Sequence, residues 1–191
     1  MNETVPPPNE EAAPRRLPGD LSKEEMIRRI LRVDQAGEYG AVRIYEGQLA
    51  VLGNKPVGSV IREMAAAERE HLATFDELLP RRRVRPTLLH PVWHVAGFAL
   101  GAGTALLGPR AAMACTAAVE EVIDQHYAKQ VAALGDDEPE LRDLCERYRQ
   151  DEVEHRETSL GHGAEQAPAY RLLTGVIKAG SRAAIWLSER I

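Results

Sequence analysis

The chain has 191 residues, enough for one domain with a substantial buried core. Its contents of 44% hydrophobic and 28% charged residues exclude a disordered chain and a multi-span membrane protein. A net charge of -5 argues against a nucleic-acid binder, and an aromatic content of only 5% favours helices over a β-sandwich. Cys115 and Cys145 form no Cys-x-x-Cys motif, so we interpret them as reduced, with a bond between them as the alternative.

Residues 1–20 are rich in proline and poor in apolar side chains, which is typical of a flexible tail. They contain no apolar run of the kind found in signal peptides. Their acidic residues are atypical of a mitochondrial presequence. We therefore expect residues 21–191 to form a single domain of a cytoplasmic, bacterial protein.

A first pair of amphipathic helices is predicted over about residues 22–52 and 57–79. Ser22, with Glu25 three residues later, forms a capping box that begins the first helix. The turn signal at residues 53–56 ends this helix, and Pro80 is expected to end the second.

Polar residues interrupt the apolar stripes of both helices. Glu38 lies within the first stripe, and Glu68 and His71 lie within the second. Gly37 and Gly40 flank Glu38, which suggests a close approach of another helix there, with a simple kink as the alternative.

Residues 92–108 form an almost wholly apolar run that follows an arginine cluster at residues 81–85. At about 17 residues the run is at the lower limit for spanning a bilayer, and its glycines weaken it as a span. We predict an interfacial or re-entrant helix on a membrane, with the arginines against anionic lipid. A helix buried in the bundle is the alternative.

A second helix pair is predicted over about residues 111–134 and from about residue 137, where Asp137 is the expected N-cap. Glu120 lies within the stripe of the first helix, and Glu152 and His155 lie within that of the second. A loop rich in Gly and Ala follows at residues 161–168, and a last amphipathic helix is predicted over residues 168–191.

The two pairs repeat one pattern. Glu68 follows Glu38 by 30 residues, Glu152 follows Glu120 by 32, and each second glutamate precedes a histidine by three residues. Residues i and i+3 share one face of a helix, so each Glu-x-x-His pair directs a carboxylate and an imidazole toward one point. We predict an all-α, ferritin-like four-helix bundle of two pseudo-symmetric hairpins, with an additional apolar interfacial helix and a C-terminal amphipathic helix.

Four buried carboxylates need counter-charge, because an isolated buried charge costs several kcal/mol even after relaxation. No lysine or arginine lies on the four stripes at these levels. Two divalent metal ions supply the missing charge, and mixed carboxylate and imidazole ligands suit iron or manganese. The alternative is that these are ordinary exposed helix charges. The predicted ligands are Glu38, Glu68, His71, Glu120, Glu152 and His155.

Other polar residues are predicted to support the ligands. A metal-bound histidine usually donates its second N–H to a carboxylate, for which Asp34 and Asp151 are candidates. Tyr39, Tyr148 and His126 are candidate catalytic residues around the ligands. We expect His126 to contact substrate or relay protons, with a plain surface residue as the alternative.

Five stretches resemble the demethoxyubiquinone hydroxylases of ubiquinone biosynthesis. They are residues 34–41 (Asp-Gln-Ala-Gly-Glu-Tyr-Gly-Ala), the glycine-rich run at 97–108, residues 114–116 (Ala-Cys-Thr), residues 119–121 (Val-Glu-Glu) and residues 187–191 (Leu-Ser-Glu-Arg-Ile). The resemblance covers about residues 21–191. It implies that the six predicted ligands hold two iron ions in a di-iron centre.

The resemblance implies an O₂-dependent monooxygenase that hydroxylates the ring of a polyprenyl methoxy-methyl-benzoquinol. It also implies a peripheral enzyme on the cytoplasmic face of the cell membrane, with other ubiquinone-biosynthesis proteins as partners and no nucleic acid. Iron oxidation or storage, a di-manganese catalase and a non-enzymatic membrane adaptor are the rival interpretations. The electron donor, prenyl length, oligomeric state and depth of membrane insertion are left open.

Overall fold

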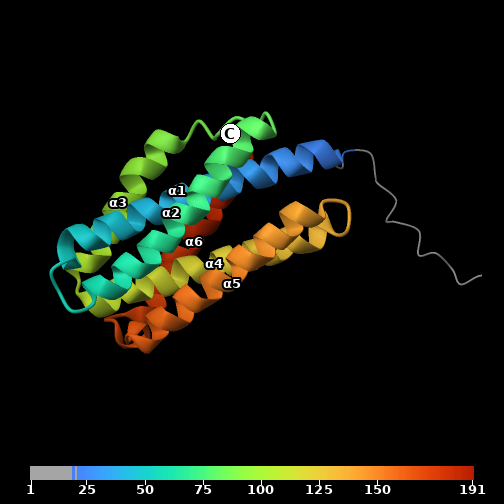
Figure 1. Ribbon diagram of the computed structural model, residues 1–191. Coiled ribbons are helices and arrows are strands. Elements are labelled where there is room, and N and C mark those ends of the chain that lie inside the picture. Colours follow the sequence, from blue (N-terminus) through green and yellow to red (C-terminus); the bar gives the residue numbers. More distant parts are fainter. Residues whose placement is uncertain (1–18, 20) are drawn as a thin grey trace, which may run out of the picture.

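The computed structural model describes residues 19 and 21–191, and within these the regular structure is entirely helical (Figure 1). The predicted all-α fold is thus confirmed. The predicted flexible tail at residues 1–20 lies outside the described residues, apart from Gly19. The helices are α1 (Lys23–Leu52), α2 (Gly58–Arg81), α3 (His90–Leu106), α4 (Pro109–Leu134), α5 (Pro139–Gly161) and α6 (Tyr170–Ser188), with a 3₁₀ turn, η1, at Ala164–Gln166.

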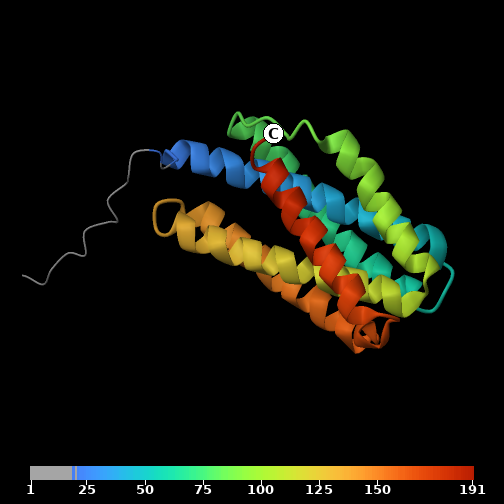
Figure 2. The same cartoon turned by 180° about the vertical axis from the view of Figure 1, so that it is seen from behind.

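Four long helices form the bundle as two hairpins. Helix α1 packs on α2, and α4 packs on α5, each pair joined by a short connection. Helix α3 lies along α1 and α6 lies along α4. Figure 2 shows α3 and α6 in front of α1 and α4, with α2 and α5 behind. The hairpin arrangement agrees with the prediction.

Local signals explain most helix ends. The Ser22 hydroxyl accepts the Glu25 amide at 3.1 Å, as a capping residue should. Pro80 does not end α2, which runs on to Arg81. A proline this close to the end removes one backbone hydrogen bond, but the Arg82 amide still bonds to the Leu78 carbonyl and completes the last turn. Asp137 is not the N-cap of α5, since Pro139 at the first helical position makes Glu138 the cap.

Two apolar clusters fill the ends of the bundle and leave a polar layer between them. One is built around Tyr45, Ile61 and Met113, and the other around Phe75 and Tyr127. Both cysteines are buried and free, as predicted. The predicted ligands therefore lie midway along the bundle, with packed side chains above and below them.

Glycines bring α3 close to α1. A Cβ atom at Gly101 would lie 1.9 Å from the Ile44 carbonyl oxygen, and one at Gly47 would lie 2.2 Å from the Phe98 carbonyl oxygen. Only hydrogen fits at these points. The predicted close approach is present at Gly40, whose carbonyl oxygen would lie 2.9 Å from a Cβ atom at Gly97 on α3, although a Cβ at Gly37 or Gly40 itself would meet no neighbouring atom within 4 Å.

Helix α3 buries one narrow face and exposes the rest. It buries only two glycines, Thr104 and Ala105, which contradicts the alternative of a helix enclosed in the bundle. Val95 is 66% exposed, and Leu172 and Val176 on α6 are 70% and 65% exposed. Within the described residues, no helix combines the length and the apolar character that crossing a bilayer requires.

Candidate metal centre

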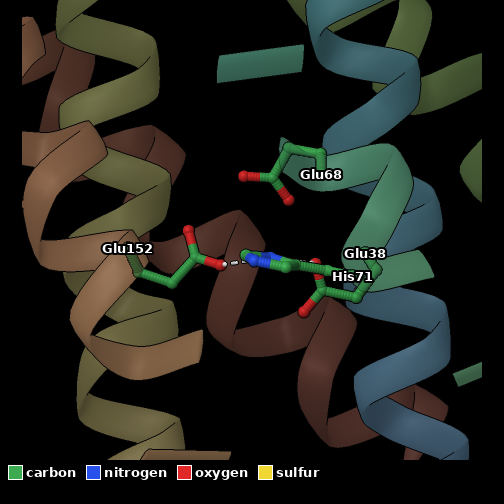
Figure 3. Close-up of side chains that lie close together, drawn as sticks. All are labelled: Glu38, Glu68, His71 and Glu152. Atoms are coloured by element: carbon green, nitrogen blue, oxygen red, sulfur yellow. Dashed lines mark ion pairs between the residues drawn. The ribbon is translucent and has the colours of Figure 1, made fainter. Parts of the chain in front are cut away.

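The six predicted ligands come together in the polar layer, one glutamate each from α1 and α4 and a Glu-x-x-His pair each from α2 and α5. All six are buried. Figure 3 shows Glu38, Glu68 and Glu152 around His71, with side chains from three helices meeting between the hairpins. Two groups of four have potential ligand atoms within 4.8 Å of one another: Glu38, Glu68, His71 and Glu152, and Glu68, Glu120, Glu152 and His155.

Glu68 and Glu152 belong to both groups. The geometry therefore describes two adjacent positions that share two carboxylates. Glu38 and His71 complete the first position. Glu120 and His155 complete the second.

Several buried atoms of these residues have no hydrogen-bond partner. They include both carboxylate oxygens of Glu68 and Glu152 and the Nδ1 atoms of both histidines. Unpaired buried polar atoms are costly, so this set requires a ligand. The Nδ1 of His155 lies 2.9 Å from Glu68 Oε1, and the Nδ1 of His71 lies 3.5 Å from Glu152 Oε1. Atoms bound to one ion at about 2.1 Å each are roughly 3 Å apart, so the residues fit two cations.

Two tyrosines hold the glutamates that belong to only one position. The Tyr45 hydroxyl on α1 donates to Glu120 at 3.0 Å, and the Tyr127 hydroxyl on α4 donates to Glu38 at 2.5 Å. The sequence analysis did not assign either tyrosine to the centre. A signal was present, because each tyrosine follows the glutamate of its own helix by seven residues.

Asp151 and Tyr148 lie against His71. The His71 Nε2 is 3.0 Å from Asp151 Oδ2, and the Tyr148 ring stacks on the imidazole at a centroid distance of 3.8 Å. The predicted pairing of Asp151 with a histidine of the centre is thus present in the structure. These contacts orient the imidazole so that Nδ1 faces the carboxylates.

Asp34 and His126 belong to a separate polar group. Gln130 Nε2 donates to Asp34 Oδ1 at 2.6 Å and lies 2.9 Å from His126 Nε2. No hydrogen bond joins Asp34 to either histidine of the centre within the part of the chain that the structure describes. His126 is partly buried, so it is not a plain surface residue.

Tyr39 faces α3 rather than the carboxylates. Its hydroxyl lies 2.6 Å from His94 Nδ1, and its ring lies 4.3 Å from the His90 ring. Because Tyr39 and Glu38 are neighbours on a helix, their side chains diverge by about 100°. Among the described residues, the structure brings Tyr148 to the centre but places Tyr39 at the α1–α3 contact.

Without cations, protons compensate the charge of the centre. Burial raises the pKa of Glu68 and Glu120, and repulsion from Glu152 raises both further. Burial also raises the pKa of Glu152 itself. Burial lowers the pKa of His71, but its contacts with Glu152 and Glu38 outweigh this and raise the pKa to about 10.

These shifts predict how the metal-free protein responds to pH. The folded state holds more protons than the unfolded state from just above pH 4.5, the ordinary glutamate value, to about pH 10. A group whose pKa is raised in the folded state stabilises the fold at low pH, and this stabilisation is lost as the pH rises. The chelated protein should therefore melt at a lower temperature at pH 8 than at pH 5.5.

Metal-loaded protein should not show this loss, because metal binding displaces the protons and strengthens as pH rises. The difference between the loaded and chelated melting temperatures is expected to widen from pH 5.5 to pH 8. Thermal scans with Fe(II) under argon and with a chelator would measure it. A chelated protein that gains stability over this range would contradict the assignment of the buried carboxylates.

An apolar groove of about 430 Å³ runs beside the centre between α1, α3, α4 and α6. Ala41 and Ile123 line it, and each follows a glutamate of the centre by three residues, on the same side of its helix. Trp93 and Ser188 also line it, and the indole N–H donates to the Ser188 hydroxyl at 3.0 Å, which links α3 to α6. The groove therefore offers apolar walls next to the buried carboxylates.

The fold and the buried cluster define a ferritin-like protein built from two helical hairpins, each contributing Glu and Glu-x-x-His. Sequence comparison matches residues 25–188 to the family described as "Ubiquinone biosynthesis protein COQ7", and the chain belongs to this family. The resemblance predicted from the motifs is confirmed.

Similar proteins carry hydroxylase names. The chain is 61% identical over 177 residues, 92% of this chain and 84% of the relative, to a Rhodospirillum rubrum protein named "3-demethoxyubiquinol 3-hydroxylase". It is 56% identical over 168 residues, 86% of this chain and 77% of the relative, to the mouse "NADPH-dependent 3-demethoxyubiquinone 3-hydroxylase, mitochondrial". The human protein of that name is 55% identical over 169 residues, 86% of this chain and 78% of the relative.

Proposed function

We propose that this protein hydroxylates the ring of a polyprenyl methoxy-methyl-benzoquinol with O₂ in ubiquinone biosynthesis. The observation that carries the proposal is the apolar groove beside two adjacent positions rich in unpaired carboxylate and imidazole atoms. The hydroxylase names of the relatives support the same reaction. Residues 21–191 form the single domain that performs it.

The centre is proposed to hold two iron ions. Glu38, Glu68, His71 and Glu152 would hold one, and Glu68, Glu120, Glu152 and His155 would hold the other. Bound iron supplies the O₂ activation that the hydroxylation of an aromatic ring requires. Manganese suits the same ligands, and the hydroxylase relatives favour iron.

The chain itself positions the substrate and the ligands. The apolar groove receives the quinol and the start of its prenyl tail, and its walls exclude water from the centre. Tyr148 and Asp151 fix the His71 ring. His126 is proposed to relay protons with Asp34, whose Oδ1 lies 3.8 Å from His126 Nε2, and Gln130 holds the two groups in place.

Tyr39 is proposed to act from the α1–α3 contact, where its bond to His94 holds α3 beside the groove. This role keeps Tyr39 among the residues that serve the reaction, at a distance from the carboxylates.

The overall reaction replaces a ring C–H bond by C–OH. One atom of O₂ enters the ring, and the other leaves as water after taking up two electrons and two protons. The mouse and human relatives are named as NADPH-dependent, which favours a reduced nicotinamide as the source of the electrons.

A peripheral position on the cytoplasmic face of the membrane is part of the proposal. Val95 on α3 and Leu172 and Val176 on α6 expose apolar side chains, and both helices line the groove. Figure 2 shows these two helices in front of α1 and α4. A quinol dissolved in lipid would enter the groove from that side. Other proteins of ubiquinone biosynthesis are the expected partners.

Isotope labelling tests the reaction. Protein reconstituted with Fe(II) under argon would receive the demethoxy quinol, NADPH and ¹⁸O₂, and the product would be weighed by mass spectrometry. We expect a gain of one labelled oxygen atom. Oxidation of Fe(II) without hydroxylated product, with or without the electron donor, would favour the iron-oxidation rival instead.

Two matched variants on α6 test whether the groove binds the substrate. Gly180 lines the groove and Gly175 does not, although both lie on α6 with open space at the Cβ position. Gly180→Leu should lower kcat/KM for a long-chain quinol by about tenfold or more, since burial of a leucine-sized volume is worth about 1.5–3 kcal/mol. Gly175→Leu should change it little, and equal losses in the two variants would contradict the groove as substrate site.

A further inference from the structure

The internal repeat extends beyond the ligands. Gln48 and Gln130 each follow the glutamate of their own helix by ten residues. Gln48 donates to Thr116 at 3.1 Å, and Gln130 donates to Asp34 at 2.6 Å. Thr116 and Asp34 each precede a glutamate of the centre by four residues. Together with the reciprocal tyrosine bonds, these pairs show that the two hairpins repeat one another beyond the six ligands.

The repeat fails behind the histidines. Asp151 directly precedes Glu152 and accepts a hydrogen bond from the outer nitrogen of His71 at 3.0 Å. The matching residue before Glu68 is Ala67, which has no polar side chain. Within the described chain, no protein group bonds the outer nitrogen of His155.

Tyr148 adds to this difference. It precedes Glu152 by four residues and stacks on His71 at 3.8 Å, whereas the matching residue before Glu68 is Met64. The His71 imidazole is therefore held from behind by a carboxylate and covered by an aromatic ring. His155 has neither a hydrogen-bonded carboxylate nor a stacked ring, and meets Tyr45 only edge-on at 6.4 Å.

A carboxylate behind a metal-bound histidine fixes the tautomer and makes the imidazole a stronger donor. The Asp151 side chain is 48% exposed, so water screens its charge and the hydrogen bond is its main contribution. The benefit falls on one position only, since Glu68 and Glu152 are common to both.

We propose that the position of Glu38 and His71 binds a divalent ion more tightly than the position of Glu120 and His155, so that the centre fills in a fixed order. This inference rests on the proposed metal centre and concerns the order of loading, which the hydroxylase function does not define.

Calorimetric titration of the metal-free, full-length protein with Co(II) tests the order. Because the two positions share two carboxylates, the second ion would bind more weakly than the first even if the positions had equal affinity. Variants are therefore needed to show which position binds more tightly. Asp151→Asn should weaken the tighter class by about 10–100-fold, the range typical of outer partners of metal ligands. Ala67→Asp, at the matching position, should strengthen the weaker class and leave the tighter one unchanged.

Histidine variants show which position corresponds to the tighter and which to the weaker class of Co(II) binding. His155→Ala should keep one tightly bound ion, and His71→Ala should lose the tight class. Circular dichroism of each variant confirms that the bundle is folded. A tight class unaffected by Asp151→Asn, or lost in His155→Ala, would overturn the order while leaving the function intact. Absence of Co(II) binding by the wild-type protein would overturn both the order and the metal centre.

Discussion

Glu152→Gln is expected to remove hydroxylase activity and reduce the bound metal from two ions to at most one. Glu152 belongs to both ligand groups and is fully buried, so its carboxylate serves both positions. The amide has the same shape but carries no charge and presents a donor where a ligand is needed. Loss of a bridging ligand should exceed the roughly 100-fold loss that removal of an outer partner can cause.

The matched control is Glu154→Gln. Glu154 lies two residues away on α5 but is exposed, so the same chemical change should leave metal content and turnover near the wild-type values. Metal content by mass spectrometry and product formation would be measured together. Because Glu152→Gln removes a buried charge, the metal-free variant should stay folded. Two ions and wild-type turnover in this variant would rule out a bridging role.

Gly101→Ala is expected to be the most destabilising small substitution. The new Cβ would lie 1.9 Å from the Ile44 carbonyl oxygen on α1, and backbone cannot yield as a flexible side chain can. Separating α3 from α1 should cost about 3 kcal/mol. For a chain of this size we expect the melting temperature to fall by roughly 6–12 °C.

Gly103→Ala provides the opposite expectation in the same helix. A Cβ at Gly103 meets nothing within 4 Å, so replacing glycine in a helix should stabilise slightly, by about 0.5–1 kcal/mol. Thermal unfolding of both variants, read by circular dichroism, measures the contrast. A similar melting temperature for the two variants would mean that the close packing of α3 on α1 does not contribute to stability. Loss of this packing contact in Gly101→Ala should also impair quinol binding, because Gly97 and Leu100 on α3 line the apolar groove.

Much of the bundle was predictable from short-range signals. Ser22, Gly53 and Gly135 mark helix ends at the residues where the structure has them. The six residues of the centre were identifiable because a charge on an apolar stripe must be buried, and two Glu-x-x-His pairs at matching spacing direct those charges to one place.

Other features depend on contacts between distant segments. Tyr45 and Tyr127 read as core residues because a tyrosine ring fits an apolar stripe, and only packing of the two hairpins shows which carboxylate each hydroxyl meets. Gly40 does lie at the predicted helix contact, opposite Gly97 of α3, but the contact needs glycine at Gly47 and Gly101 rather than at Gly40 itself. Glycine content alone does not show which side of a helix meets a neighbour.

Side-chain direction was the remaining difficulty. Tyr39 follows Glu38 directly, and proximity in sequence suggested proximity at the centre. On a helix, adjacent residues point in different directions, and Tyr39 meets His94 on α3. The prediction that Asp151 pairs with a histidine of the centre was correct. Asp151 reaches His71 of the other hairpin, a pairing that sequence spacing permits but does not require.

The exchange of tyrosine bonds between the hairpins gives the bundle the symmetry of a twofold dimer. Each hairpin caps a glutamate of the other, so a hairpin alone leaves its own glutamate uncapped. Two identical hairpins associating about a twofold axis would make both bonds with a single gene product. The single chain has the symmetry that such a homodimer would have, and one polypeptide permits differences such as Asp151 opposite Ala67 that two identical subunits could not have.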